Sequence, residues 1–355
     1  MSAPFQVPFV TQGVRASGGR FKQRPEDFQV EELPAYLPQG EGEHVFFWVQ
    51  KRGLSTVEAA KRLARALALP PDAVSWAGMK DTVALTRQWL SARVAGRELP
   101  TLPAFGPELE VLEMKRHLNK LKGGHLKGNR FRIFIGQVSD FGAAKESFEV
   151  LARGGLPNFF GMQRFGRDAE NASRGKLLLA NPKMRAARFE RKLWLSAWQS
   201  LAFNQVLSAR VMDGTWRKPL LGDVLKKHES GGEFVCTEPL VDEKRAEAFE
   251  LSPTGPMYGP QMRPSSGETA ALEAKVLASE GVTMAQLAAE RLTPGTRRLL
   301  RVPMSNASIE ARDGGAWLQF ELPSGAYATV VLNEIIKPGS NELELADEQP
   351  TEEEP

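Results

Sequence analysis

The sequence predicts an α+β fold, with a sheet built from both ends of the chain and a helix-rich stretch between them. Residues 28–33 alternate between two faces, and residues 44–49 are aromatic and β-branched, as in a buried strand. Near the other end, residues 317–322 alternate in the same way and residues 327–332 continue with strand character. Sheet at both ends with helix between is the order that an inserted domain produces.

A helix and a third strand follow in the first part of the chain. Ser55 and Glu58 form a capping-box pattern, and apolar residues then recur at helical spacing over 57–67 until Pro70 ends the helix. Residues 130–138 alternate cleanly, with the apolar side chains Phe131, Ile133 and Ile135 on one face.

The middle of the chain begins at a break in this pattern. Gly154 and Gly155 mark a domain boundary. Beyond them, residues 191–212 predict a long helix, residues 231–267 are dense in Gly and Pro and predict loops, and residues 269–280 predict another helix.

The expected domain organisation follows from these elements. Residues 1–154 and 304–339 are predicted to form one sheet-based domain, and residues 155–303 an inserted domain. The end of the chain, residues 340–355, is acidic and poor in apolar residues, so we expect it to be disordered.

Composition indicates a cytosolic protein without a cofactor. Of the 355 residues, 42% are hydrophobic and 25% charged, and no apolar run reaches the length of a membrane span. The first residues lack the basic-then-apolar pattern of a signal peptide. Cys236 is the only cysteine, which excludes an intrachain disulfide and a cysteine cluster for zinc. The four histidines are scattered, so we expect no metal site.

Charge is distributed unevenly along the chain. The net charge is +3, but the residues from Ser340 onward contain seven acids and no bases, so the first 339 carry 46 bases against 36 acids, or +10. An excess of positive charge favours polyanionic partners. Charge alone leaves open a basic enzyme that has no nucleic-acid partner.

Several segments combine charged, aromatic and glycine residues. Taken singly, they have simpler interpretations: a solvated turn, a polar loop entering a strand, a joint packed by aromatic side chains, or a hairpin turn. Taken together they form an ordered set: residues 22–32, 78–81, 127–131, 158–166, 194–205 and 322–329.

In this order the segments resemble the TruD family of pseudouridine synthases. Its pattern comprises a Lys-x-x-Pro-Glu-Asp-Phe-x-Val-x-Glu opening, a Gly-x-Lys-Asp turn, an Asn-aromatic-Phe-Gly-x-Gln-Arg-Phe-Gly hinge and a Leu-Pro-x-Gly-x-aromatic-Ala-Thr close. The resemblance runs from about Arg20 to Glu334, and the nine-residue hinge is its most specific part. It implies a pseudouridine synthase domain with an inserted domain, acting on uridine in RNA, usually uridine 13 of transfer RNA.

The resemblance also implies a nucleophile. Asp81, in the Gly78–Asp81 turn, matches the family's catalytic aspartate. A carboxylate can act covalently or stabilise charge at the reacting sugar or base, and the sequence leaves open attack on C1′, attack on C6 or action as a base. A nearby cation would hold it ionised and oriented. Lys22 matches the family's lysine, and adjacent Lys80, which we also place among the substrate-binding residues, is the alternative partner.

Further residues would receive a flipped-out uridine. Phe28, Phe131 and Tyr327 match the family's aromatic positions, and Asn129 matches a residue that would hydrogen-bond the base edge. Most pseudouridine synthases have Tyr at the position of Phe131. At the position of Tyr327, Phe also occurs in the family. For each aromatic residue, simple core packing is the alternative.

Basic clusters suggest how RNA would be held. Residues 115–132 contain seven Lys or Arg and no acid, residues 164–192 contain nine bases against three acids, and Arg297, Arg298 and Arg301 form a third cluster. We expect a monomer, without a membrane partner, that grips folded transfer RNA in a basic cleft between domains. The alternatives are a non-catalytic RNA-binding protein, against which Asp81 and Lys22 argue, and an enzyme acting on small nucleosides, which would need no basic track.

Overall fold

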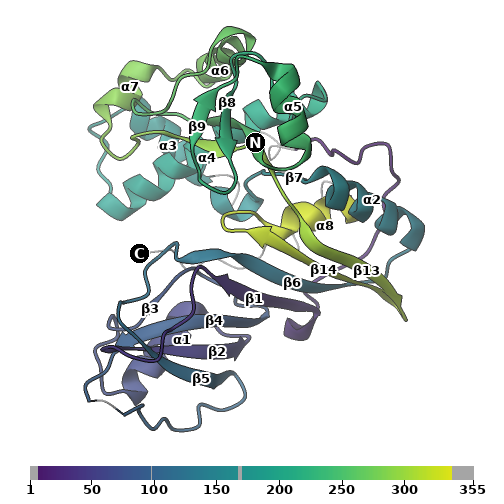
Figure 1. Ribbon diagram of the computed structural model, residues 1–355. Helices are drawn as coiled ribbons and strands as arrows, with labels where there is room; N and C mark the ends of the chain where they lie inside the picture. Colours follow the sequence, from purple (N-terminus) through teal and green to yellow (C-terminus); the bar gives the residue numbers. More distant parts are fainter. Residues whose placement is uncertain (1–6, 97, 167–169, 338–355) are drawn as a thin grey trace. The chain divides into compact units, whose positions relative to one another are not determined.

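The computed structural model describes residues 7–96, 98–166 and 170–337 (Figure 1). The predicted disordered tail, residues 340–355, lies outside them. The chain divides into two compact units. The unit that we call the sheet unit comprises Ala16–Glu146, Met304–Gly325 and Ile336–Pro355, and the helical unit comprises Met1–Arg15, Ser147–Pro303 and Ala326–Ile335.

These compact units differ from the predicted domains at both ends of the chain. The predicted division assigns residues 1–15, 147–154 and 326–335 to the sheet-based domain, whereas the helical unit contains them. The helix α2 (Phe141–Gly154) spans the boundary between the two units. The functional division into a catalytic and an inserted domain stays a prediction.

A mixed sheet of eight strands organises the sheet unit. Its order is β13-β14-β6-β1-β4-β2-β5, with β3 paired to β4; β1 and β4 run parallel and the other pairs are antiparallel. The pairing of β14 with β6 brings a late and an earlier segment of the chain into one sheet, which confirms the predicted sheet. The strands are β1 (Phe28–Pro34), β2 (His44–Arg52), β3 (Ser75–Trp76), β4 (Leu85–Arg93), β5 (Leu109–His117), β6 (Leu126–Gly136), β13 (Ser305–Arg312) and β14 (Gly315–Pro323).

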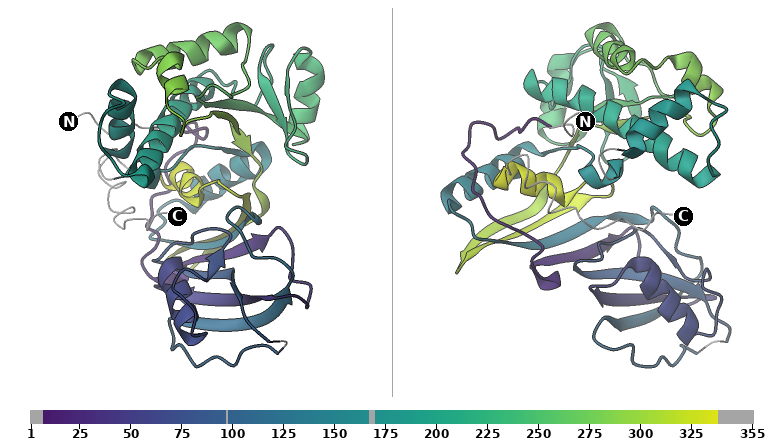
Figure 2. Two further views of the ribbon diagram at one scale, coloured as in Figure 1. Left: turned by 90° about the vertical axis from the view of Figure 1, so that its left-hand side faces the viewer. Right: turned by 180° about the vertical axis from the view of Figure 1, so that it is seen from behind.

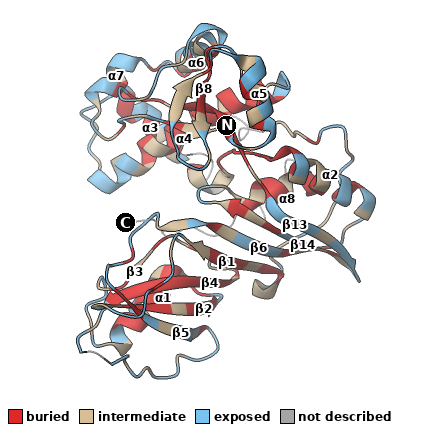
Figure 3. Ribbon diagram, viewed as in Figure 1, coloured by how far each residue is buried: buried red, intermediate tan, exposed pale blue. Residues whose placement is uncertain are grey.

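One helix covers a face of this sheet (Figure 2). The helix α1 (Thr56–Ala66) begins where predicted, and the hydroxyl of Ser55 accepts a hydrogen bond from the Glu58 amide. Its apolar side packs Leu63 against Phe47 and other fully buried residues of β2 and β4. A second cluster, centred on Phe46 and Trp89, uses neighbouring positions of the same strands. Most residues of β2 and β4 are therefore buried (Figure 3).

The helical unit is built around one long helix. Trp198 and Phe203 of α4 (Arg188–Met212) are fully buried, and α4 packs against α3 (Glu170–Ala180) and the strand β10 (Leu251–Met257). A four-stranded sheet has the order β11-β10-β8-β9. The remaining elements are η1 (Pro25–Asp27, in the sheet unit), η2 (Met162–Phe165), α5 (Pro239–Glu247), α6 (Gly267–Ser279), α7 (Met284–Ala289), α8 (Ala328–Ile336), β7 (Leu156–Pro157), β8 (Val224–Lys227), β9 (Glu233–Val235), β11 (Thr296–Leu299) and β12 (Arg301–Val302).

The prediction of loops over residues 231–267 was wrong. This stretch contains β9, the helix α5 and the central strand β10. Pro239 is the first residue of α5, a position where proline costs no hydrogen bond. In β10, a Cβ on Gly255 would lie 2.9 Å from the Phe203 ring, so glycine there serves close packing rather than a turn.

The prediction of strand character over residues 327–332 was also wrong, because the helix α8 begins at Ala328, directly after Tyr327. The β-branched run that suggested a strand is buried in the helix, with Val331 and Leu332 fully enclosed. A further anchor is Glu334, whose carboxylate accepts hydrogen bonds from the Val10 and Thr11 amides. Tertiary packing therefore overrides local propensity here. None of the described helices is both long and apolar enough to cross a membrane.

Candidate active site

The Gly78–Asp81 turn lies between β3 and β4 in the sheet unit, and its two charged residues have different surroundings. The Asp81 carboxylate is one-third exposed and accepts a hydrogen bond of 3.0 Å from the Lys22 amino group. Lys22 adopts a left-handed backbone conformation (φ 58°), and its amino group lies 4.5 Å from the centre of the Phe28 ring. Lys22 is therefore the cation that pairs with Asp81.

The neighbouring Lys80 points the other way. Its amino group forms an ion pair of 3.0 Å with Glu32 of β1, and both side chains are almost completely buried. The second oxygen of Glu32 accepts a hydrogen bond from the Trp89 amide. The side chains at 80 and 81 thus diverge, and the amino group of Lys80, for which a substrate contact is predicted, is engaged inside the sheet unit.

A buried lysine that the sequence analysis did not single out supports the same turn. Lys51 of β2 is 1% exposed, and its amino group donates to the carbonyl oxygens of Leu54 (2.6 Å), Lys80 (3.3 Å) and Asp81 (2.8 Å). Burial lowers the pKa of Lys51 to about 7, against the opposing effect of the Asp81 charge. Three carbonyl acceptors match the three donors of an ammonium group.

The start of α1 fixes the other side of the turn. The hydroxyl of Thr56 accepts from the Lys80 amide at 3.0 Å and donates to the amide oxygen of Gln88 at 2.9 Å. The Gln88 side chain in turn donates to the Gly78 carbonyl at 3.0 Å. Buried side chains therefore hold the backbone of the turn, while the Asp81 carboxylate stays accessible.

The predicted base-binding residues of the sheet unit lie on β1 and β6, which pair with each other. Phe28 meets Phe131 edge to face at 6.3 Å between ring centres, and Phe131 stacks on Phe320 at 5.3 Å. Both predicted aromatic residues are more than nine-tenths buried. The Oδ1 atom of Asn129 is buried and has no hydrogen-bond partner within the described part of the chain. A buried acceptor without a partner is costly unless a ligand satisfies it.

Tyr327, the remaining predicted site residue, belongs to the helical unit. Its ring lies 6.1 Å from Phe160 of the Asn158–Gly166 hinge motif, and it borders Gly161. The backbone of Phe160 exchanges hydrogen bonds with the Asn204 side chain of α4. The family motifs around 158–166 and 194–205 are therefore joined in the helical unit, and the motif 322–329 is divided between the units.

The third basic cluster was wrongly predicted to serve as an RNA track. The side chain of Arg297 is fully buried and forms two hydrogen bonds with the Glu273 carboxylate, and Arg301 is 4% exposed. Arg298 lies over the Phe160 ring at 3.9 Å, and burial lowers its pKa to about 10. These arginines hold the helical unit together. In the other two clusters, most of the basic residues that the structure describes are exposed.

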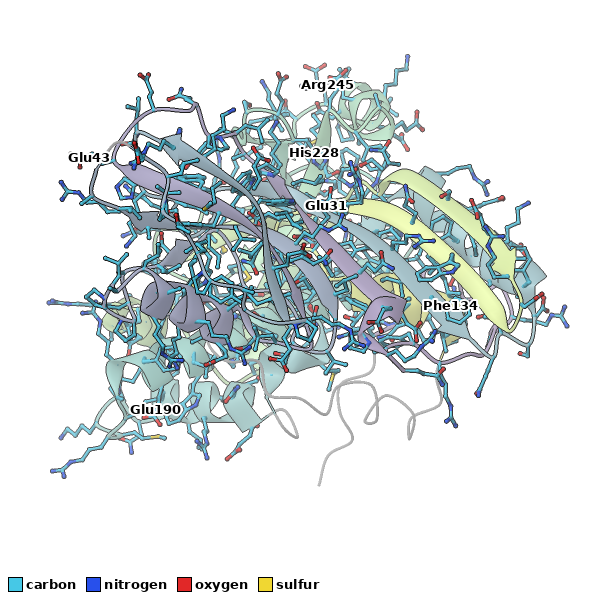
Figure 4. The ribbon with its side chains drawn as sticks, turned by 90° about the horizontal axis from the view of Figure 1, so that it is seen from below. Glu31, Glu43, Phe134, Glu190, His228 and Arg245 are labelled. Carbon is cyan, nitrogen blue, oxygen red and sulfur yellow. The ribbon has the colours of Figure 1, made fainter. Side chains whose placement is uncertain are left out.

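Some supporting residues could have been found from the sequence. Alternation along β2 places Lys51 on the same face as Val45 and Val49, and alternation along β1 places Glu32 beside Val30. A charged residue in such a register indicates a buried partner. By contrast Glu31, labelled in Figure 4, lies on the other face of β1 and forms an exposed ion pair with Arg130 at 2.9 Å. Among the described residues, no group of His, Cys, Asp or Glu is placed to hold a metal ion.

Comparison with known proteins agrees with this α+β fold. A crystal structure of a Methanosarcina mazei protein described as a "putative tRNA pseudouridine synthase D (TruD)" superimposes with a TM-score of 0.73 at 23% identity, covering 94% of this chain and 97% of that one. It shows that the fold is shared.

The sequence comparisons reach further. The family "tRNA pseudouridine synthase D (TruD)" matches residues 7–190 and 185–335. A protein named tRNA pseudouridine synthase D from Anaeromyxobacter dehalogenans is 46% identical over 344 residues, or 95% of this chain and 98% of that protein. One of the same name from Thermus thermophilus is 39% identical over 335 residues, or 94% and 93%. The chain belongs to the TruD family of tRNA pseudouridine synthases, which are isomerases.

Proposed function

We propose that this chain converts uridine 13 of transfer RNA into pseudouridine, with Asp81 as the nucleophile. The observation that carries the proposal is the Lys22–Asp81 pair, which is accessible at the tip of a turn whose other polar groups are buried. Membership of the family supports the reaction class and the RNA substrate. Position 13 and the role of Asp81 rest on the matching motifs.

The proposed reaction requires little beyond a carboxylate that is correctly positioned at the nucleoside. The N1–C1′ bond of uridine breaks, the uracil turns, and a C5–C1′ bond forms, while the proton lost from C5 is balanced by one gained at N1. Nothing is oxidised or added. Asp81 can attack C1′, attack C6, or take up a proton, and each requires its oxygen free to approach the nucleoside. Lys22 restrains one carboxylate oxygen at 3.0 Å and leaves the other to react.

Preorganisation of the turn is the contribution of the surrounding protein. Lys80, Lys51 and Thr56 hold the backbone of the turn from the inside. A nucleophile fixed in this way loses little freedom on reaching the transition state, and small displacements are costly. We assign these three residues to positioning rather than to contact with the reacting atoms.

Recognition of the flipped base falls to residues on β1 and β6 in the sheet unit. Phe28 and Phe131 provide apolar packing, and the Oδ1 atom of Asn129 an acceptor suited to the N3–H of uracil, while an aromatic contact by Tyr327 of the helical unit stays a prediction. Exposed basic side chains in residues 115–132 and 164–192 bind the phosphates of the RNA. We also propose that the protein acts as a monomer in the cytosol.

A transfer RNA transcript tests the substrate assignment. The purified protein is incubated with a transcript carrying uridine at position 13, and pseudouridine is mapped by a chemical stop in reverse transcription. A stop at position 13, absent from a transcript with cytidine 13, is expected. Modification at other uridines only would refute the position, and no modification of any transcript would favour a non-catalytic RNA-binding protein.

A further inference from the structure

A second concave site lies in the sheet unit, apart from the residues assigned to the reacting uridine. It has a volume of about 500 Å³, which is within the range of small-ligand sites. Aromatic, amide and basic side chains line it, and no acid does. Its lining comes from the segment after β1 and from the end of β5 with the loop that follows: Tyr36, Leu37, Gln39, His117, Leu118, Asn119, Lys120, Lys122 and His125.

Aromatic rings form one side of this site. Tyr36 stacks on His117 with ring centres 5.2 Å apart and planes within 24°, and its hydroxyl lies 2.6 Å from Nδ1 of His125. Beneath them, Phe46 meets the His117 ring edge to face at 4.9 Å. The Tyr36 ring is therefore held in one orientation while remaining partly exposed. Leu37 and Leu118 are more than half exposed, although both are large and apolar.

One buried polar atom at the site lacks a partner. His117 is 7% exposed, and its Nδ1 has no hydrogen-bond partner in the described part of the chain. Burial lowers the pKa of His117, so the ring is neutral near pH 7 and repels no cationic neighbour. A buried nitrogen without a partner is satisfied when a ligand donates to it or accepts from it.

The wall of this site is connected to the catalytic turn. The amide of Gly124 donates to the carbonyl of Ala77 at 2.7 Å, directly before the Gly78–Asp81 turn. The Ala35 amide donates to the His125 carbonyl at 3.4 Å, which ties the segment after β1 to the same loop. A ligand bound here would thus contact a segment that directly contacts the residue preceding the turn.

From these features we infer that the Tyr36–His117 site binds an unpaired nucleobase of the RNA substrate, with its phosphate held by Lys120 and Lys122. The inference rests on the proposed function for the identity of the RNA. An aromatic ring that is fixed and partly exposed is what base stacking needs, and amide groups of Gln39 and Asn119 can reach base edges. The two exposed lysines, without an acid in the lining, complement a phosphate.

Kinetics on a transfer RNA transcript test this assignment. Tyr36→Ala should raise KM about tenfold and leave kcat nearly unchanged, since stacking on one aromatic ring is worth roughly that factor or more. Tyr36→Phe, which keeps the ring and loses only the hydroxyl, should retain most of the affinity. Lys120→Ala with Lys122→Ala should raise KM and flatten its salt dependence, whereas Lys61→Ala on the exposed face of α1 should change neither.

Unchanged KM in Tyr36→Ala and in the lysine pair, or a loss confined to kcat, overturns the assignment. Circular dichroism identifies a variant that fails to fold, in which case the lysine pair, exposed on the surface, decides the question. A crosslinking arm separates this site from the catalytic proposal: a transcript containing 4-thiouridine is irradiated with the Asp81→Asn protein. Crosslinks to residues 36–39 or 117–125 support the site even if no pseudouridine forms, and crosslinks only elsewhere reject it.

Discussion

Two lysine–carboxylate pairs meet at the same turn and differ in their surroundings rather than in their geometry. Lys22–Asp81 and Lys80–Glu32 both have a nitrogen–oxygen distance of 3.0 Å. The carboxylate of the first is one-third exposed, whereas both side chains of the second are at most 3% exposed. The buried pair fixes the turn, and the open pair leaves a carboxylate free to react. Burial thus separates a structural ion pair from a candidate catalytic one.

The largest expected effect is on stability, at the buried pair. Lys80→Met leaves the Glu32 charge buried without its cation, which should lower the free energy of unfolding by about 3–5 kcal/mol. Combining it with Glu32→Leu should recover most of that loss, because no buried charge remains. Urea unfolding measures both. At the open pair, Lys22→Met should cost about 1 kcal/mol or less. Equal losses in the free energy of unfolding at the two pairs would contradict the distinction between a buried structural pair and an open one.

The next effect is on catalysis, through Lys51. Lys51→Met removes the donors to the carbonyls of residues 80 and 81, and we expect kcat to fall by about 100-fold, since small displacements of a nucleophile have effects of this size. KM for transfer RNA should stay close to that of the parent. Lys61→Met on the surface of α1 is the matched control. A change in KM alone would show that Lys51 does not position the turn.

Lys51 also gives a pH dependence of stability. Its pKa is lowered to about 7 in the folded chain, from an ordinary value of 10.5. The unfolded chain therefore binds more protons between these values, so the contribution of Lys51 to the free energy of unfolding rises as pH increases from about 7 to 10.5. The parent should gain stability relative to Lys51→Met across this window. A difference that is flat with pH would contradict the lowered pKa.

The smallest effect concerns RNA affinity. Arg185→Glu with Arg188→Glu, exposed just before α4 and at its first residue, should reduce the slope of log affinity against log salt by about 0.7 for each lost phosphate contact. Affinity measured by filter binding over a salt series gives this slope. If the slope is unchanged, this cluster is an ordinary solvated surface.

Periodicity predicted the sheet but not the whole of either unit. Strands β1, β6 and β14 were found because their apolar residues alternate, and β2 because it is rich in aromatic and β-branched residues. The helix α8 and the strand β10 were missed, because burial against distant parts of the chain overrides a β-branched run in one and proline and glycine in the other. Local patterns carry no information about such long-range packing.

The sequence likewise predicted only part of the candidate site. Motifs identified Asp81 and Lys22, but left open which lysine pairs with the carboxylate, because the direction of neighbouring side chains depends on the folded turn. The structure answers this with Glu32, a residue 48 positions before Lys80. Arg297 and Arg301 illustrate the opposite error, in which structural residues were predicted to bind RNA. A basic run in the sequence does not reveal whether its side chains already donate to buried carboxylates and carbonyl oxygens.

Replacement of Asp81 tests the central claim most directly. Asp81→Asn keeps the size of the side chain and removes the nucleophile, while the buried pair that fixes the turn is untouched. Turnover is measured as pseudouridine formed in a transfer RNA transcript, and binding is measured on the same transcript. We predict that pseudouridine formation is abolished and that affinity stays within a few-fold of the parent, because phosphate contacts dominate affinity. Turnover at one-tenth of the parental rate or more would contradict the assignment of Asp81 as the nucleophile.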